Sequence, residues 1–226
     1  MIISVDKMSS YITYPCYIEQ VVADKRSFNI IQDSELIAGT KQRGINYFIQ
    51  LKDQGIKHIV TYGTVHGYGQ VATAWCAQQV GLKCTLFLPE QIPMTSMTLE
   101  AIGYGADVIQ IKRNWTRQHS KPDYGYATTP ILKFNALEYI KSHQESILLG
   151  LGLDNPDFIS HLSKGISKSI DLIPKRLWVA AGSGVLVRAL SQVFPDTEFH
   201  VVQVGRKIYP DIFVGIKHVL YKCELP

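Results

Sequence analysis

One lysine of this sequence stands where its amine could act as a nucleophile. Residues 39–44 read Gly-Thr-Lys-Gln-Arg-Gly, which places Lys41 just past a glycine, at the start of an expected amphipathic helix. The partial positive charge of a helix N-terminus disfavours an ammonium group, and Arg43 adds a like charge two positions on. We therefore expect the pKa of Lys41 to be lowered and its amine to be reactive. A solvated surface lysine is the alternative that these six residues leave open.

Two glycine-bearing turns are expected where a parallel sheet binds ligands, between a strand and the following helix. The first covers residues 61–70 and holds Thr64, His66, Gly67 and Tyr68. His66 is read either as a functional side chain or as an ordinary polar loop residue. No two histidines have the spacing of metal ligands, so we predict no catalytic metal.

The second turn is Gly182-Ser183-Gly184. Its glycines allow close backbone approach, Ser183 offers a hydroxyl, and the amides of the next helix attract an anion. A phosphate group is the expected ligand, and a tight turn without a ligand is the alternative. The turn lacks the Lys-Ser/Thr of a P-loop, and Val187 replaces the third glycine of a dinucleotide-binding fingerprint.

Composition indicates an ordinary globular protein: 226 residues, 46% hydrophobic and 19% charged, with a formal net charge of +4. No signal-peptide core or long apolar span is present, and none of the four cysteines forms a Cys-x-x-Cys pair. We predict a cytoplasmic protein with reduced thiols and no membrane contact. Nucleic-acid binding has one candidate, the basic segment 112–121 with Trp115, which is better explained as a solvated loop.

The elements that must position these residues alternate along the chain. Strands are expected at 56–62, 83–88, 107–111, 146–149, 177–181 and 199–205, and helices at 68–80, 96–103, 131–143, 154–170 and 184–193. This order predicts an α/β fold of parallel sheets with helices on both faces. We expect two lobes, a larger one of residues 1–53 plus 130–226 and a smaller βαβαβ lobe of residues 54–129.

The lysine segment, the glycine turn and the late Gly-Ser-Gly turn, in this order, resemble the tryptophan-synthase-β-like family of fold-type-II pyridoxal-phosphate enzymes. The nearest branch is that of aminocyclopropane-carboxylate deaminases and cysteine desulfhydrases, whose lysine motif is similar to residues 39–43. The likeness continues through Gln-Val-Ala at 70–72, Gly-Leu-Lys-Cys at 81–84, Gly-Ala-Asp-Val at 105–108 and Gln-Val-Gly at 203–205. Only the ordered combination is specific, since each piece alone is common.

The resemblance implies that Lys41 holds pyridoxal 5′-phosphate as an aldimine and then moves protons at the substrate's α-carbon. It implies that Gly182, Ser183 and Gly184 bind the phosphate, and that the 61–69 turn, including Thr64 and Gly67, meets the cofactor ring and the substrate carboxylate. The larger lobe would then supply Lys41 and the Gly182 turn, the smaller lobe would supply the 61–69 turn, and the cofactor would lie in the cleft between them. The expected activity is that of a lyase, deaminase or β-replacement enzyme acting on an amino acid or amino-acid-like group, in a homodimer.

The sequence departs from the family in two places. The asparagine that normally lies by the cofactor ring is missing from the 61–69 turn, where His66 or Tyr68 could replace it as catalytic residue. A residue for the pyridine nitrogen is not found before the chain ends at Pro226. Two alternatives therefore stay open: a non-catalytic module that binds a phosphate ligand, and a phage-type enzyme that modifies aminoacylated bases in DNA.

Overall fold

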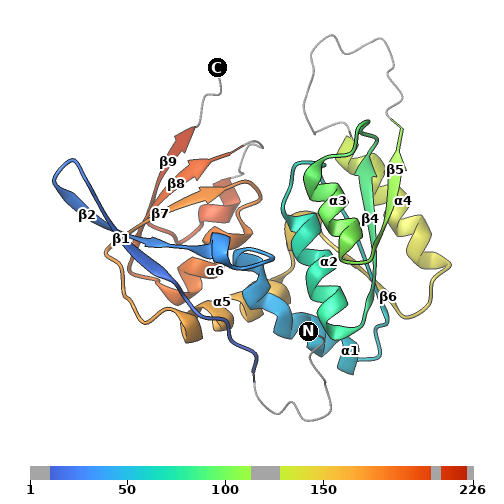
Figure 1. The fold of residues 1–226 in the computed structure, drawn as a ribbon, viewed down its shortest axis with the longest axis horizontal. Helices are drawn as coiled ribbons and strands as arrows, with labels where there is room; N and C mark the ends of the chain where they lie inside the picture. The colour runs from blue at the N-terminus through green and yellow to red at the C-terminus, as the bar shows by residue number, and fades with distance from the viewer. Residues whose placement is uncertain (1–10, 113–127, 205–209, 223–226) are drawn as a thin grey trace, which may run out of the picture. The chain divides into compact units, whose positions relative to one another are not determined.

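The structure is a computed structural model that describes residues 11–112, 128–204 and 210–222 (Figure 1). The chain forms two compact units, and each unit is built from stretches that are not contiguous in the sequence. Within the described residues, the first unit comprises 47–112 and 128–155, and the second comprises 11–46, 156–204 and 210–222. The segment 112–121, expected as a basic loop, lies almost wholly outside the described residues.

The first unit is a parallel four-stranded sheet in the order β5-β4-β3-β6. Its strands are β3 (His58–Tyr62), β4 (Lys83–Pro89), β5 (Ala106–Ile111) and β6 (Ser146–Leu149). Helices α2 (Gly69–Val80) and α3 (Ser96–Gly103) cover one face, and α4 (Thr128–Lys141) covers the other (Figure 1). Every residue of β3 is buried, as a central strand covered on both faces requires. No helix in the described part of the chain is long and apolar enough to cross a membrane.

The second unit contains a parallel three-stranded sheet in the order β7-β8-β9. Its strands are β7 (Arg176–Ala181), β8 (Glu198–Gln203) and β9 (His218–Lys222). Helix α6 (Val185–Val193) packs on β7, and α5 (Pro156–Ser169) packs on α6. The buried side chains of Val179, Phe199 and Val201 alternate with more exposed neighbours, as expected for a strand face turned toward the core.

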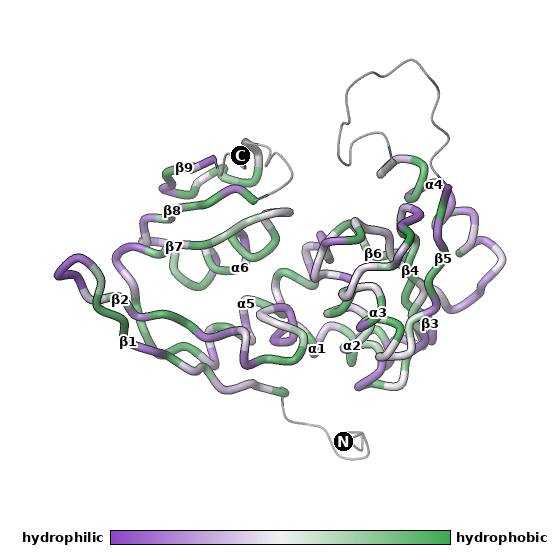
Figure 2. Tube along the Cα trace, turned by 45° about the horizontal axis from the view of Figure 1, so that its top comes forward, coloured by the Kyte–Doolittle hydropathy of each residue, from purple (hydrophilic) through white to green (hydrophobic). Residues whose placement is uncertain are grey.

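The N-terminal part of the second unit is an antiparallel hairpin that the sequence did not predict. Strands β1 (Ile18–Ala23) and β2 (Arg26–Ile31) pair through the two-residue turn Asp24-Lys25, which is coloured hydrophilic in Figure 2. Both turn residues have positive φ, 48° and 61°. Glycine and asparagine are the usual signals for such a turn, and neither is present here.

A run of short helical turns connects the hairpin to the first unit. These are η1 (Asp33–Glu35), η2 (Thr40–Gly44) and then α1 (Ile45–Asp53). Two further 3₁₀ turns are present in the described residues: η3 (Leu151–Leu153) follows β6, and η4 (Pro210–Phe213) precedes β9. The helix expected to begin near Lys41 thus begins at Ile45, because residues 40–44 form a tighter 3₁₀ turn.

The predicted α/β fold with parallel sheets is confirmed. The two units, however, divide the chain at 46/47 and 155/156, whereas the expected lobes divide it at 53/54 and 129/130. The physical reason is strand pairing: Ser146–Leu149 pairs with β3 and α4 packs on the same sheet, which brings both into the first unit. Which part of the chain holds a cofactor stays a prediction.

Candidate active site

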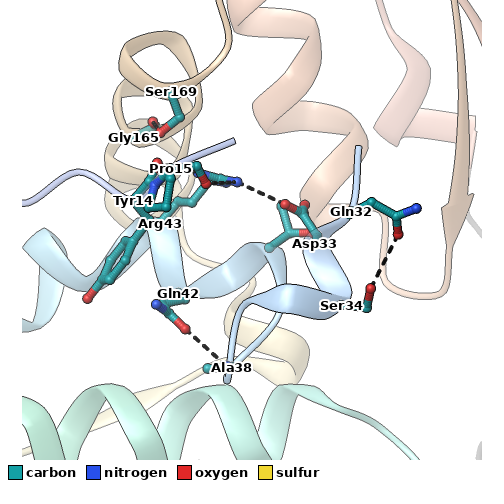
Figure 3. Close-up of polar contacts among 11 residues, drawn as sticks. Tyr14, Pro15, Gln32, Asp33, Ser34, Ala38, Gln42, Arg43, Gly165 and Ser169 are labelled. Atoms are coloured by element: carbon teal, nitrogen blue, oxygen red, sulfur yellow. Dashed lines mark hydrogen bonds and ion pairs between the residues drawn. The ribbon is translucent and has the colours of Figure 1, made fainter. Parts of the chain in front are cut away.

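Lys41 lies in a 3₁₀ turn whose conformation is fixed on both sides. Gly39 precedes it with φ 61° and ψ −166°, a region open essentially to glycine alone. The side chain of the buried Gln42 accepts a hydrogen bond from the Ala38 amide at 3.1 Å (Figure 3). The backbone around Lys41 is therefore held in one conformation, and the lysine itself is partly buried.

Arg43 has a different environment from the one expected from the sequence. Its guanidinium is 1% exposed and forms an ion pair with Asp33 at 2.9 Å (Figure 3). It also donates to the backbone carbonyls of Tyr14 at 2.8 Å and Pro15 at 3.1 Å. Because the carboxylate of Asp33 offsets part of the charge of Arg43, the expected like-charge effect of Arg43 on Lys41 is weaker than the sequence alone implies.

The 3₁₀ turn approaches helix α5 closely through two glycines. A Cβ placed on Gly165 would lie 2.2 Å from the carbonyl oxygen of Arg43. A Cβ on Gly44 would lie 2.5 Å from the ring of Phe158. The absence of side chains at both positions lets η2 and α5 pack at backbone distance, so α5 supports the turn that carries Lys41.

The Gly182–Gly184 turn has the properties of an anion site. Gly184 is the N-cap of α6, has φ 81°, and is packed against the side chain of Ile212. No side chain caps the helix N-terminus, so the first-turn amides are not used by a cap. Gly182 is exposed and Ser183 is partly exposed, which leaves the turn accessible from solvent. A phosphate fits such a site.

Lys41 and the Gly182–Gly184 turn belong to the same unit. Turn η2 packs on α5, α5 packs on α6, and Gly184 begins α6. The residues of the 61–70 turn belong to the other unit. Lys41 and the Gly182–Gly184 turn are therefore linked within one unit by elements that pack directly on one another, η2 on α5 and α5 on α6.

The loop between β3 and α2, residues 63–68, is held by polar side chains that are buried or partly buried. The side-chain amide of Gln70 donates to the carbonyl of Val65 at 2.9 Å, and the hydroxyl of Thr95 donates to the same carbonyl at 2.7 Å. Thr98 in turn donates to Gln70 Oε1 at 3.2 Å. These contacts fix Val65 inward. Sequence reasoning missed Thr95 and Thr98, because they come from a helix thirty residues further on.

The candidate residues of this turn face solvent. Thr64, His66 and Tyr68 are exposed, and Gly67 is partly exposed. A Cβ on Gly67 would lie 2.8 Å from the Thr64 hydroxyl, so this position favours glycine. The Tyr68 hydroxyl donates to Glu100 at 3.2 Å. Burial, followed by the charge of Glu100 and this hydrogen bond, raises the pKa of Tyr68. The Tyr68 hydroxyl thus stays protonated and donates a hydrogen bond to Glu100.

The fold is shared with solved structures of enzymes. A homologue of ACC deaminase matches with a TM-score of 0.72 and 17% identity, over 94% of this chain and 72% of that chain. An O-acetylserine-dependent cystathionine β-synthase from Helicobacter pylori matches with a TM-score of 0.64 and 17% identity, over 92% of this chain and 75% of that one.

A pyridoxal 5′-phosphate-dependent aspartate racemase matches with a TM-score of 0.57 and 16% identity. The match covers 83% of this chain and only 56% of the racemase, so the chain spans little more than half of that enzyme. No protein-family model and no curated protein matches this sequence. The chain has the fold of the fold-type-II pyridoxal-phosphate enzymes, as its resemblance to them predicts.

Proposed function

We propose that this chain is a pyridoxal-phosphate-dependent enzyme that acts on an amino acid or an amino-acid-like group. The observation that carries the proposal is the occurrence, in one unit, of a conformationally fixed lysine turn and an uncapped helix N-terminus behind Gly-Ser-Gly. The shared fold supports the same cofactor. The particular reaction within the lyase, deaminase and β-replacement classes is part of this proposal.

The residues of the second unit suit the parts of the cofactor. The backbone amides of the exposed Gly182, the partly exposed Ser183 and the first turn of α6 would bind the phosphate, together with the hydroxyl of Ser183. Lys41 would bond covalently to the cofactor aldehyde and, once released, would carry a proton to or from the substrate's α-carbon. When bound, the cofactor supplies an electron sink. The roles of Thr64, His66, Gly67 and Tyr68, and the homodimer, stay predictions from the resemblance.

Covalent labelling of the purified protein tests the proposal. Pyridoxal phosphate is added, the mixture is reduced with borohydride, and the labelled lysine is located by mass spectrometry. The expected result is a label on Lys41, a visible absorbance band before reduction, and loss of both in Lys41→Ala. The matched control is Lys133→Ala, which removes an exposed lysine of α4 and should leave both unchanged. Absorbance changes on adding amino acids would support turnover.

Two outcomes separate this function from its alternatives. A protein that binds inorganic phosphate competitively with pyridoxine phosphate, but acquires no label on Lys41, would be a non-catalytic binding module. A labelled protein whose absorbance responds to an aminoacylated nucleoside or DNA, and not to free amino acids, would be an enzyme of DNA modification. The basic segment that motivates the second outcome lies almost wholly outside the described residues.

A further inference from the structure

One carboxylate is bonded to both sides of the lysine turn. Asp33 Oδ2 accepts a hydrogen bond from the hydroxyl of Thr40 at 2.5 Å, and Asp33 Oδ1 accepts one from Arg43 Nη2 at 2.9 Å. Thr40 immediately precedes Lys41, and Arg43 follows it by two positions. The two oxygens of a single side chain thus span the residue that carries the amine.

We propose that Asp33 is the positioning residue for Lys41, and this inference rests on the function proposed above. Asp33 would act through Thr40 and Arg43, by holding the backbone of Lys41 in the orientation that presents its amine to the cofactor aldehyde. A displacement of about 1 Å at a reacting group can lower a rate by about 100-fold, so a small rotation of this turn is enough to matter.

The burial of Arg43 makes the carboxylate the dominant part of this arrangement. Arg43 is 1% exposed, whereas the side chain of Asp33 is 23% exposed. Without Asp33, the buried guanidinium would keep the neutral carbonyls of Tyr14 and Pro15 as its partners, and charge-assisted bonds are the stronger kind. An uncompensated buried cation draws in water or shifts, and a shift of Arg43 would move Lys41, two positions earlier in the same turn.

The backbone hydrogen bonds around the turn limit the displacement expected on loss of Asp33 to residues 40–43. Leu36 donates to the carbonyl of Asp33 at 3.1 Å, and Gln42 donates to the carbonyl of Gly39 at 3.0 Å. These bonds close η1 and η2 separately, but they do not join them. The Ala38 to Gln42 bond stays within residues 38–42. A backbone bond from Gly39 to the carbonyl of Leu36 at 2.9 Å links the residues that flank the two turns, and the side chain of Asp33 adds a direct link from η1 to Thr40 and Arg43 of η2.

The test measures covalent trapping at Lys41 separately from binding of the phosphate. Pyridoxal phosphate with borohydride gives the rate of label formation on Lys41. Pyridoxine phosphate, which has no aldehyde, gives the affinity of the phosphate site alone. For Asp33→Asn we expect the labelling rate to fall by about 10-fold or more while the affinity for pyridoxine phosphate changes by less than about twofold.

Two further variants keep the test decisive. Glu35→Gln removes an exposed carboxylate from the same 3₁₀ turn and should label at the wild-type rate. Thr40→Val breaks one bond to Asp33 but leaves the ion pair, so it should lower the labelling rate even where Asp33→Asn folds poorly.

The outcomes distinguish this inference from the function on which it rests. If the wild-type protein acquires no label on Lys41, the proposed function and this inference both fail. If the wild-type protein is labelled, and both Asp33→Asn and Thr40→Val are labelled at the wild-type rate, only the inference fails. Equal losses of labelling and of pyridoxine phosphate affinity would show that Asp33 serves stability alone, which also overturns the inference.

Discussion

Replacing Gly165 by alanine tests whether α5 supports the lysine turn. The added Cβ would lie 2.2 Å from the carbonyl oxygen of Arg43 and 3.1 Å from its Cβ, whereas ordinary van der Waals contact begins at 3.4 Å. The first of these distances is short by more than an ångström and involves backbone, so a side-chain rotation cannot relieve it. Either η2 moves away from α5 or the helix bends.

The magnitude follows from two opposing effects. Alanine is favoured over glycine inside a helix by roughly 0.5–1 kcal/mol, and Gly165 lies within α5. Overpacking of a tight contact costs about 1–3 kcal/mol, and a backbone contact belongs near the upper end. We therefore expect a net loss of about 2 kcal/mol in the free energy of unfolding, which lowers the urea midpoint by about 1 M.

Urea denaturation followed by circular dichroism measures this loss, and hydrogen exchange locates it. Exchange should become faster at the amides of Thr40–Gly44, because the turn is displaced from α5. The matched control is Gly103→Ala, at the end of α3, where a Cβ would have nothing within 4 Å. The control should leave stability unchanged or raise it slightly. A wild-type midpoint together with unchanged exchange in Gly165→Ala would refute the packing of η2 on α5.

Two further predictions concern the first unit. Thr95→Ala should lower stability by about 1–2 kcal/mol, because the Thr95 hydroxyl both caps α3 and donates to the Val65 carbonyl, whereas Thr95→Ser should lose much less in the same urea titration. Burial lowers the pKa of His58 below its ordinary 6.5, so the unfolded state binds this proton more tightly. Stability should therefore fall as the pH drops below about 6.5 and level off below the folded-state pKa; urea midpoints for the wild type and His58→Gln at several pH values would show this, and an equal acid dependence in both would contradict it.

The periodic elements could be read from the sequence because local signals mark both of their ends. Helix α3 and strand β6 occupy the predicted residues, Ser96–Gly103 and Ser146–Leu149. Thr95 supplies the N-cap of α3, and Gly105 ends the loop after it with φ 80°. Apolar runs between such signals leave little choice of structure.

The elements that the sequence missed are those stabilised without such signals. All but two residues of β1 and β2 are exposed, so no apolar alternation marks these strands. Their turn uses Asp24 and Lys25 at positive φ in place of glycine. Strand β9 is exposed along its whole length and is defined by pairing with β8, a contact that a local pattern does not contain.

The candidate site shows the same division between local and distant information. Glycine turns and a lysine motif are local, and the sequence located both. The partner of Arg43 was not located, because Asp33 lies ten positions earlier in a separate turn. From the sequence, Arg43 is expected to act as a like charge beside Lys41. In the structure this charge is paired with the carboxylate of Asp33.

This pairing changes the physical reason for singling out Lys41. The ion pair with Asp33 weakens the like-charge effect that Arg43 can exert on Lys41, because the carboxylate offsets part of the guanidinium's field. What distinguishes Lys41 in the structure is its backbone: a glycine at φ 61° before it, a buried glutamine after it, and a carboxylate bonded to both flanks. If Lys41 is reactive, its reactivity comes from presentation of the amine in a preorganised turn.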